Sequence, residues 1–293
     1  MLHPKDFIHP EDEAALRNME AIQGFAAAMK MLMKYYQEQQ FHGISMASKI
    51  RLSPKQLPDI YNILPPICQR LSIQEPEFYL EMNPMPNAYA FGDTRTMISI
   101  TSGLLEYLTP DEVRSVVAHE CGHVACRHML YHSLAWTLVQ QINSLGVLGK
   151  MIMPVVWALF YWQRKSELSA DRAAAIALCD ADKVVETHIR LSGGPKSITK
   201  DVNIEEFVAQ ADYYDTLKQD TWDKLLQYLA IMNASHPFSA VRVREILKWS
   251  KTEQYQRLLD ALSHPSSNGT CPNCHKNVQE DWHFCKHCGV ELK

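Results

Sequence analysis

The sequence predicts an α+β fold that is mostly helical, with one small β-sheet and a small cysteine-rich module at the C-terminus. Apolar residues recur at helical spacing over residues 14–36, 57–71, 104–145 and 222–262. Between residues 78 and 101 the pattern changes to β-rich, with M-I-S-I-T at residues 97–101. Two C-x-x-C pairs follow near the end, and a chain of 293 residues has room for one sizeable helical core and such a module.

These patterns divide the chain into four predicted parts. We expect an N-terminal helical region at residues 1–60, a main domain at 61–262, a linker at 263–270 and the cysteine-rich module at 271–293. The linker is indicated by S-H-P-S-S-N-G-T, a polar run rich in turn-forming residues.

Residues 87–101 are predicted to form two neighbouring strands. The run N-A-Y-A-F at residues 87–91 precedes the β-rich run that ends at Thr101. The first of these strands would be an edge strand, where an extended polypeptide can pair through its main chain. An ordinary hairpin in which Asn87 and Gly92 serve turns is the alternative.

The run that begins at the capping residue Thr109 is predicted to form a helix that carries H-E-C-G-H at residues 119–123. Thr109, Pro110 and Glu112 supply the cap, the first helical position and the third residue of a capping box. Residues four apart on a helix lie about 40° apart around the axis and roughly 6 Å along it. One Zn²⁺ ion can therefore bridge His119 and His123, while Glu120 can take a proton from a zinc-bound water.

A surface helix with two unrelated histidines is the alternative explanation of this motif. The flanking runs V-V-A at 116–118 and V-A-C at 124–126 instead indicate a buried helix. Burying two imidazoles and a carboxylate is costly without a partner such as a metal. Cys121 points away from the metal face of the helix, so it is not a candidate ligand.

The third ligand of a catalytic zinc is predicted to be the carboxylate of Glu167. A third histidine six residues after His123 is excluded, because Met129 occupies that position. Glu167 lies in a helix-favouring run at residues 164–178, with Asp171 four residues later on the same face. Asp171 can accept the free N–H of a ligand imidazole, for which we favour His119. A solvated acidic pair on an exposed helix is the alternative.

Together with His236-Pro237 and Arg242, these motifs resemble the HtpX-like and CAAX-prenyl-protease-like gluzincin peptidases. Further matches are N-A-Y-A-F-G at residues 87–92, G-L-L at 103–105, H-P-E-D at 9–12 and the region 52–61, which looks like the soluble bacterial branch. The resemblance covers residues 1–262 and implies a zincin-type catalytic domain.

The resemblance also implies a role for each site residue. His119, His123 and Glu167 would hold the catalytic zinc, and Glu120 would act as general base and then as proton donor. His236 would donate a hydrogen bond to the oxyanion. Arg242 would orient that loop or pair with an acid, the alternative being a surface arginine on a helix.

The implied activity is a zinc-dependent metalloendopeptidase that acts on extended or unfolded polypeptides. The substrate would pair with an edge strand formed by Asn87, Ala88, Tyr89 and Ala90. A non-hydrolytic zinc-binding scaffold or a latent peptidase is one alternative, which the presence of Glu120 disfavours. A membrane-associated CAAX-type protease is another, which the lack of long apolar N-terminal segments disfavours.

Composition and the N-terminus predict a cytoplasmic protein. The net charge of −4 gives no general attraction to nucleic acid, and M-L-H-P-K-D lacks the features of a signal peptide. The scattered cysteines at 68, 121, 126 and 179 are interpreted as buried free thiols.

Residues 151–162 form an uncharged run that is shorter than the roughly 20 residues of a membrane span. A buried helical hairpin between the two metal-bearing helices is the simplest interpretation of this run. Two Trp and a Tyr before Arg164-Lys165 also suit a membrane interface, so peripheral membrane contact is the alternative.

The C-terminal module is predicted to be a zinc ribbon with a structural zinc ion. Its two C-x-x-C pairs are separated by ten residues and offer four thiolates, those of Cys271, Cys274, Cys285 and Cys288. Redox pairs or a disulfide clasp are the alternative, which a reducing compartment disfavours. Its Lys residues are balanced by acids, so we favour a protein partner over a nucleic acid.

Overall fold

The computed structural model describes residues 2–20, 38–133, 147–216 and 238–263, together with residues 271, 273, 274, 276, 278 and 283–291. The side chains of residues 19–20 and 147–158 lie outside this description. By its contacts the chain forms two compact units, Met1–Ser250 and Lys251–Lys293. The predicted division of the chain at residues 60, 262 and 270 remains a prediction.

The first unit contains a mixed sheet of four strands in the order β1-β2-β4-β3. β2 (Glu77–Glu81) runs parallel to β4 (Met97–Thr101), while β1 (Ile50–Arg51) and β3 (Ala88–Phe91) are antiparallel to their neighbours. Every residue of β4 is buried, as expected for a central strand. β3 is the outer strand on one side. β1 was not predicted, because two residues leave no periodic signal.

Helices make up most of the rest, which confirms the predicted mostly helical fold with a small sheet. Their bounds in chain order are 3₁₀ helix η1 (Pro4–Asp6), α1 (Pro10–Glu20), α3 (Gln39–Ser48), α4 (Pro58–Tyr61), α5 (Leu64–Leu71), α6 (Ser102–Tyr107), α7 (Pro110–Ala125), α9 (Val147–Leu178), α10 (Ala181–Gly193), α11 (Lys196–Thr199), α12 (Ile204–Thr216), α14 (Ser239–Ser250) and, in the second unit, α15 (Glu253–Ser263).

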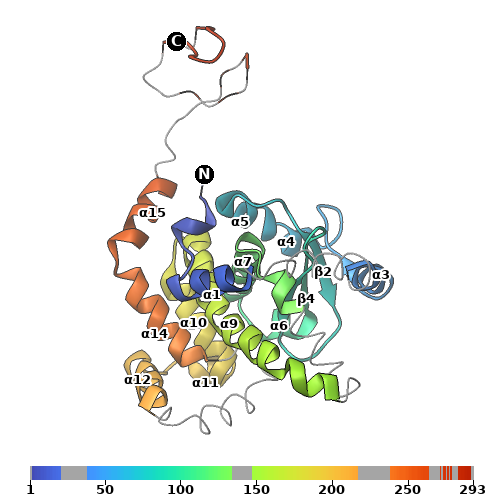
Figure 1. The fold of residues 1–293 in the computed structure, drawn as a ribbon, viewed down its shortest axis with the longest axis vertical. Helices are drawn as coiled ribbons and strands as arrows, with labels where there is room; N and C mark the ends of the chain where they lie inside the picture. The colour runs from blue at the N-terminus through green and yellow to red at the C-terminus, as the bar shows by residue number, and fades with distance from the viewer. Residues whose placement is uncertain are drawn as a thin grey trace. The chain divides into compact units, whose positions relative to one another are not determined.

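Helix α7 lies between the sheet and the pair α9 and α10, and it contacts β3, α5, α9 and α10 (Figure 1). It begins at the predicted capping box, in which the Thr109 hydroxyl accepts from the Glu112 N–H and the Glu112 carboxylate accepts from the Thr109 N–H. Gly122 sets its distance from α9. A Cβ at this position would lie 2.8 Å from the Cβ of Ala173 and 2.9 Å from the Cα of Ala170. The two helices therefore cross at a contact that only a glycine permits.

Helix α9 corrects one expectation. Residues 151–162 are not a hairpin between the two metal-bearing helices but the first half of α9 itself, which continues through Glu167 to Leu178. Arg164 and Lys165 are partly buried within this continuous helix. Trp162 is buried against Tyr131 and so faces the core, whereas Tyr161 is exposed. Among the helices of the described residues, none combines the length and apolarity that crossing a membrane requires.

A buried carboxylate fixes the turn between β3 and β4. Glu38 precedes α3 and accepts hydrogen bonds from the backbone N–H groups of Asp93, Thr94 and Arg95 and from the Thr94 hydroxyl. Burial raises the pKa of Glu38, but these four donors together outweigh it and lower the pKa from its ordinary value. The carboxylate thus links α3 to the sheet.

The thiols outside the C-terminal module are mostly buried, as predicted. Cys68, Cys121 and Cys126 are buried, and burial raises the pKa of the Cys121 and Cys126 thiols. The prediction was wrong for Cys179, which is exposed. It follows the last residue of α9 in the left-handed conformation (φ 55°) that ends many helices.

Candidate metal centre

Three buried side chains from α7 and α9 converge on one point. The Nε2 atoms of His119 and His123 lie 3.1 Å apart, and Glu167 places Oε2 3.3 Å from the first and Oε1 3.4 Å from the second. Donors at 2.0–2.2 Å from a tetrahedral zinc lie about 3.3 Å from one another. The three separations therefore fit zinc, and two imidazoles with one carboxylate are a known donor set of catalytic zinc sites.

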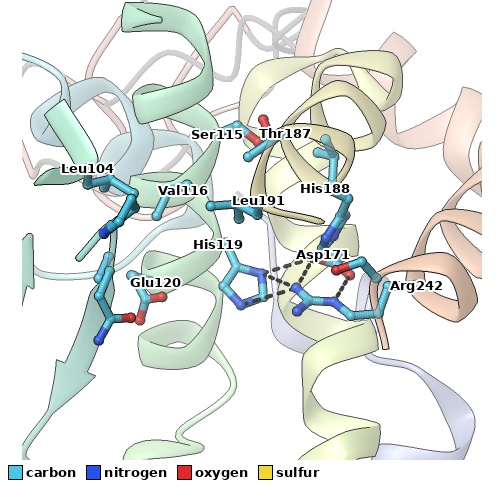
Figure 2. Close-up of a pocket in the computed structure, with 15 residues that line it drawn as sticks. Leu104, Ser115, Val116, His119, Glu120, Asp171, Thr187, His188, Leu191 and Arg242 are labelled. Carbon is cyan, nitrogen blue, oxygen red and sulfur yellow. Dashed lines mark hydrogen bonds and ion pairs between the residues drawn. The ribbon is translucent and has the colours of Figure 1, made fainter. Parts of the chain in front are cut away.

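Asp171 holds His119 from the other side of the ring. Its Oδ1 lies 3.0 Å from His119 Nδ1 and 3.1 Å from Nε2 of His188. Arg242 donates to both oxygens of Asp171, at 2.7 and 2.6 Å, and places Nη1 2.8 Å from Glu167 Oε2. Figure 2 shows Asp171, His188 and Arg242 grouped beside the His119 ring, with Glu120 on its other side. Arg242 is only 3% exposed, so the structure places it among the acids and not on the surface.

His188, on α10, is a site residue that the sequence interpretation missed. It lies on the apolar face of α10 together with Val184 and Val185, all of them buried. A histidine at an apolar position of an amphipathic helix was the available signal, but such a residue carries no motif of its own.

Burial and the neighbouring charges shift the pKa values of Asp171, His119 and His123. Burial raises the pKa of Asp171, but Arg242 and His188 outweigh it and hold that pKa well below its usual range. Burial and Arg242 lower the pKa of His119, but hydrogen bonds to Asp171 and Glu167 outweigh them and raise it to about 9. Burial lowers the pKa of His123 to about 3. The His119 imidazole therefore holds its second proton more tightly than a free imidazole does, and a metal that binds at Nε2 must displace that proton.

Glu120 faces a cavity of about 300 Å³ beside His119. Glu120 is 1% exposed and follows His119 on α7, and its side chain lies beside that ligand (Figure 2). Four apolar side chains contribute to the wall, those of Leu104, Val116, Val184 and Leu191. Pro86, Asn87 and Ala88 line it at the start of β3. The cavity thus joins the candidate base to the outer strand of the sheet.

The remaining predicted site residues are placed differently. Asn87 and Ala88 reach the cavity, whereas the Tyr89 hydroxyl is bound to Glu81 and to the Lys49 ammonium. Ala90 pairs with Ile98 within the sheet. His236 lies outside the described residues.

The C-terminal unit brings its four cysteines together. The Sγ atoms of Cys271 and Cys288 lie 3.5 Å apart, and those of Cys274 and Cys285 lie 3.6 Å apart. Thiolates at 2.3 Å from a tetrahedral zinc lie about 3.7 Å from one another, so this cluster also fits zinc. A tight turn, in which the Gly289 N–H donates to the Cys285 carbonyl, brings Cys288 back to the cluster.

The chain is similar to known proteins. The profile of Peptidase family M48 matches residues 54–250. The plastoglobule-localized metallopeptidase 48 of Arabidopsis thaliana is 31% identical over 269 residues, which cover 91% of this chain and 78% of that protein. The Protease HtpX homologs of Moorella thermoacetica and Trichormus variabilis are 26% and 24% identical, covering 61% and 77% of this chain and 70% and 85% of their own lengths.

Proposed function

The chain belongs to Peptidase family M48 and is a zinc metallopeptidase, and on that premise we propose that it is an endopeptidase for extended or unfolded polypeptides. The observation that supports this proposal best is the position of Glu120. It follows a zinc ligand on α7 and faces a cavity that also borders the outer strand of the sheet.

We assign a role to each residue of the site. His119, His123 and Glu167 would hold a zinc ion, which would supply a Lewis acid for the scissile carbonyl and for the attacking water. Glu120 takes the proton of the attacking water and passes it to the leaving amine. Asp171 accepts the Nδ1–H of His119 and so fixes the tautomer that leaves Nε2 for the metal. His236 remains our candidate for the donor to the oxyanion.

The substrate is proposed to bind as a further strand beside β3. Main-chain pairing at Asn87, Ala88, Tyr89 and Ala90 would hold any extended segment regardless of its sequence. The apolar wall of the cavity would then receive one side chain next to the scissile bond, which favours apolar residues there. A folded protein cannot offer such a segment, which is why we propose unfolded chains as substrates.

The other assignments remain proposals. We propose that the four C-terminal cysteines hold a structural zinc ion, that this ribbon contacts a protein partner, and that the protein acts in the cytoplasm. Peripheral membrane contact through residues 151–162 would not involve Trp162, which is buried.

The test compares wild type with Glu120→Gln on unfolded casein, with zinc counted in both proteins. Both should hold two zinc ions per chain, whereas cleavage by the variant should fall by about 10²–10⁴-fold, because only the proton transfer is lost. A folded, disulfide-bonded protein serves as the control substrate and should stay intact. Equal cleavage by both proteins, or no cleavage by the zinc-loaded wild type, would contradict the proposal.

A further inference from the structure

A carboxylate from the N-terminus of the chain is buried next to the metal centre. Asp12, on α1, is completely buried. Its Oδ2 lies 3.0 Å from Nε2 of His128 and accepts a hydrogen bond of 2.5 Å from the Ser169 hydroxyl. Burying a carboxylate costs free energy that hydrogen bonds or a charged partner must offset. The mechanism derived above uses neither Asp12 nor His128.

The end of α7 explains how His128 comes to lie beside a metal ligand. Arg127 adopts the left-handed conformation (φ 61°), its N–H donates to the Val124 carbonyl, and the N–H of His128 donates to the His123 carbonyl. These two bonds form a Schellman motif, which turns the chain back over the last turn of the helix. As a result, Nδ1 of His128 lies 2.9 Å from Nδ1 of His123.

The His128 ring is also held by packing. It is completely buried, and the ring of Trp162 packs against it edge-on with 5.5 Å between centroids. The ring therefore has one nitrogen toward Asp12 and the other toward His123.

Once His123 binds zinc through Nε2, it is determined which nitrogen of His123 and which nitrogen of His128 carries a proton. A neutral imidazole that binds through Nε2 carries its proton on Nδ1. Nδ1 of His128, at 2.9 Å, can accept that proton if it is itself unprotonated. His128 must in turn carry its proton on Nε2, where Asp12 Oδ2 accepts it. A hydrogen-bonded carboxylate behind a ligand imidazole raises the basicity of the ligand and fixes its orientation.

We propose that Asp12 and His128 are positioning residues for the catalytic zinc, acting as a relay that fixes the tautomer and orientation of His123. The relay corresponds to the role of Asp171 behind His119, with His128 inserted between carboxylate and ligand. The proposal rests on the assignment of His123 as a zinc ligand in the proposed function. It makes the N-terminal helix α1 a part of the metal site.

The alternative role of Asp12 is to dock α1 on α9. A substitution at the neighbouring Glu11 distinguishes this role from the relay. Glu11 pairs with Lys165 of α9 at 2.5 Å, but its side chain is 55% exposed and does not contact the relay. Glu11→Gln therefore weakens the same helix contact without touching His128.

The experiment measures metal affinity in the full-length protein. His128→Phe keeps a ring of similar size but removes the acceptor for His123, and Asp12→Asn keeps the shape but removes the charge. We expect zinc affinity at the His/Glu site to fall 10–100-fold in His128→Phe, to fall less in Asp12→Asn, and to stay unchanged in Glu11→Gln. Competition with a chelator gives the affinities. Cadmium-113 NMR separates this site from an all-sulfur site, because the shift depends on the ligand atoms.

A second measurement needs no variant. In the zinc-loaded wild type, nitrogen-15 NMR of the imidazoles should show His128 protonated at Nε2 and not at Nδ1. A doubly protonated His128, or unchanged zinc affinity in folded His128→Phe, would overturn the relay and leave the peptidase proposal intact. A wild type that takes up no metal at the His/Glu site would overturn both.

Discussion

Arg242 neutralises two buried acids, and its removal should cost more than the loss of a surface ion pair. Arg242→Met leaves Asp171 and Glu167 without their guanidinium, so we expect the free energy of unfolding of the metal-free protein to fall by about 3–5 kcal/mol. Denaturant titration measures this loss.

A control lies two residues further along α14. Arg244 pairs with Asp212 and Asp215, whose side chains are 69% and 41% exposed. Arg244→Met should therefore cost no more than about 1 kcal/mol. If the two variants were equally destabilised, the buried cluster would not contribute the stability that its contacts indicate.

Glu38 should make stability depend on acid pH. Its folded-state pKa lies below the ordinary value of 4.5, so its contribution is complete above that pH and is lost as the pH falls through the folded-state pKa. Glu38→Gln should thus be about 1.5–3 kcal/mol less stable than wild type at pH 7, with a gap that narrows below pH 4.5.

Thermal unfolding from pH 7 to pH 3 measures that gap. The control is Glu75→Gln, at an exposed carboxylate that accepts one hydrogen bond from Tyr61. It should differ from wild type by less than about 0.5 kcal/mol at every pH. A constant gap for Glu38→Gln would mean that its carboxylate is not charged in the fold.

At the scale of the elements, the distance between α7 and α9 at their crossing decides whether the three zinc ligands can meet. Gly122→Ala would place a methyl group within 3.0 Å of both the backbone and a side chain of α9, so the helices must move apart. We expect a loss of about 1–3 kcal/mol in stability and weaker zinc binding, because Glu167 moves with α9.

Gly43 provides the matched control for this substitution. It lies in α3, where a Cβ would meet nothing within 4 Å. Gly43→Ala should raise stability by about 0.5–1 kcal/mol and leave zinc affinity unchanged. Unchanged zinc affinity in Gly122→Ala would show that the close crossing is not needed for the site.

The sequence predicted those elements whose signals are local. The capping box and the H-E-C-G-H run both lie within α7, so its start and its metal face could be read directly. Glu167 followed from its spacing to Asp171. The Asp12–His128 contact joins residues 116 positions apart, and no local pattern encodes such a pairing. His188 and Arg242 reach the site only through the packing of α10 and α14 on α9. β1 has two residues, and tertiary pairing with β2 alone defines it.

At the scale of the whole molecule, we expect each of the two compact units to bind its own zinc ion independently of the other. Cys285→Ser removes one of four thiolates from the C-terminal unit, so we expect the variant to hold one zinc ion fewer than the wild type. Casein cleavage per chain should stay within about twofold, because the unit Met1–Ser250 contains every described candidate residue of the catalytic site.

Atomic absorption and the casein assay give both values for this variant. Cys179→Ser, at an exposed thiol outside the cluster, is the control and should keep both ions. Loss of both ions, or of cleavage, in Cys285→Ser would show that the ribbon supports the catalytic unit.

The spread of the site along the chain has a consequence for biosynthesis. The groups that shape the metal centre begin at Asp12 and end at Arg242, so the ribosome must release most of the polypeptide before they can meet. Such long-range closure is slow compared with the formation of single helices. A nascent chain, itself extended and unfolded, is thus not exposed to its own active site. On the proposed substrate class, the chain becomes an active peptidase only after it has ceased to resemble a substrate.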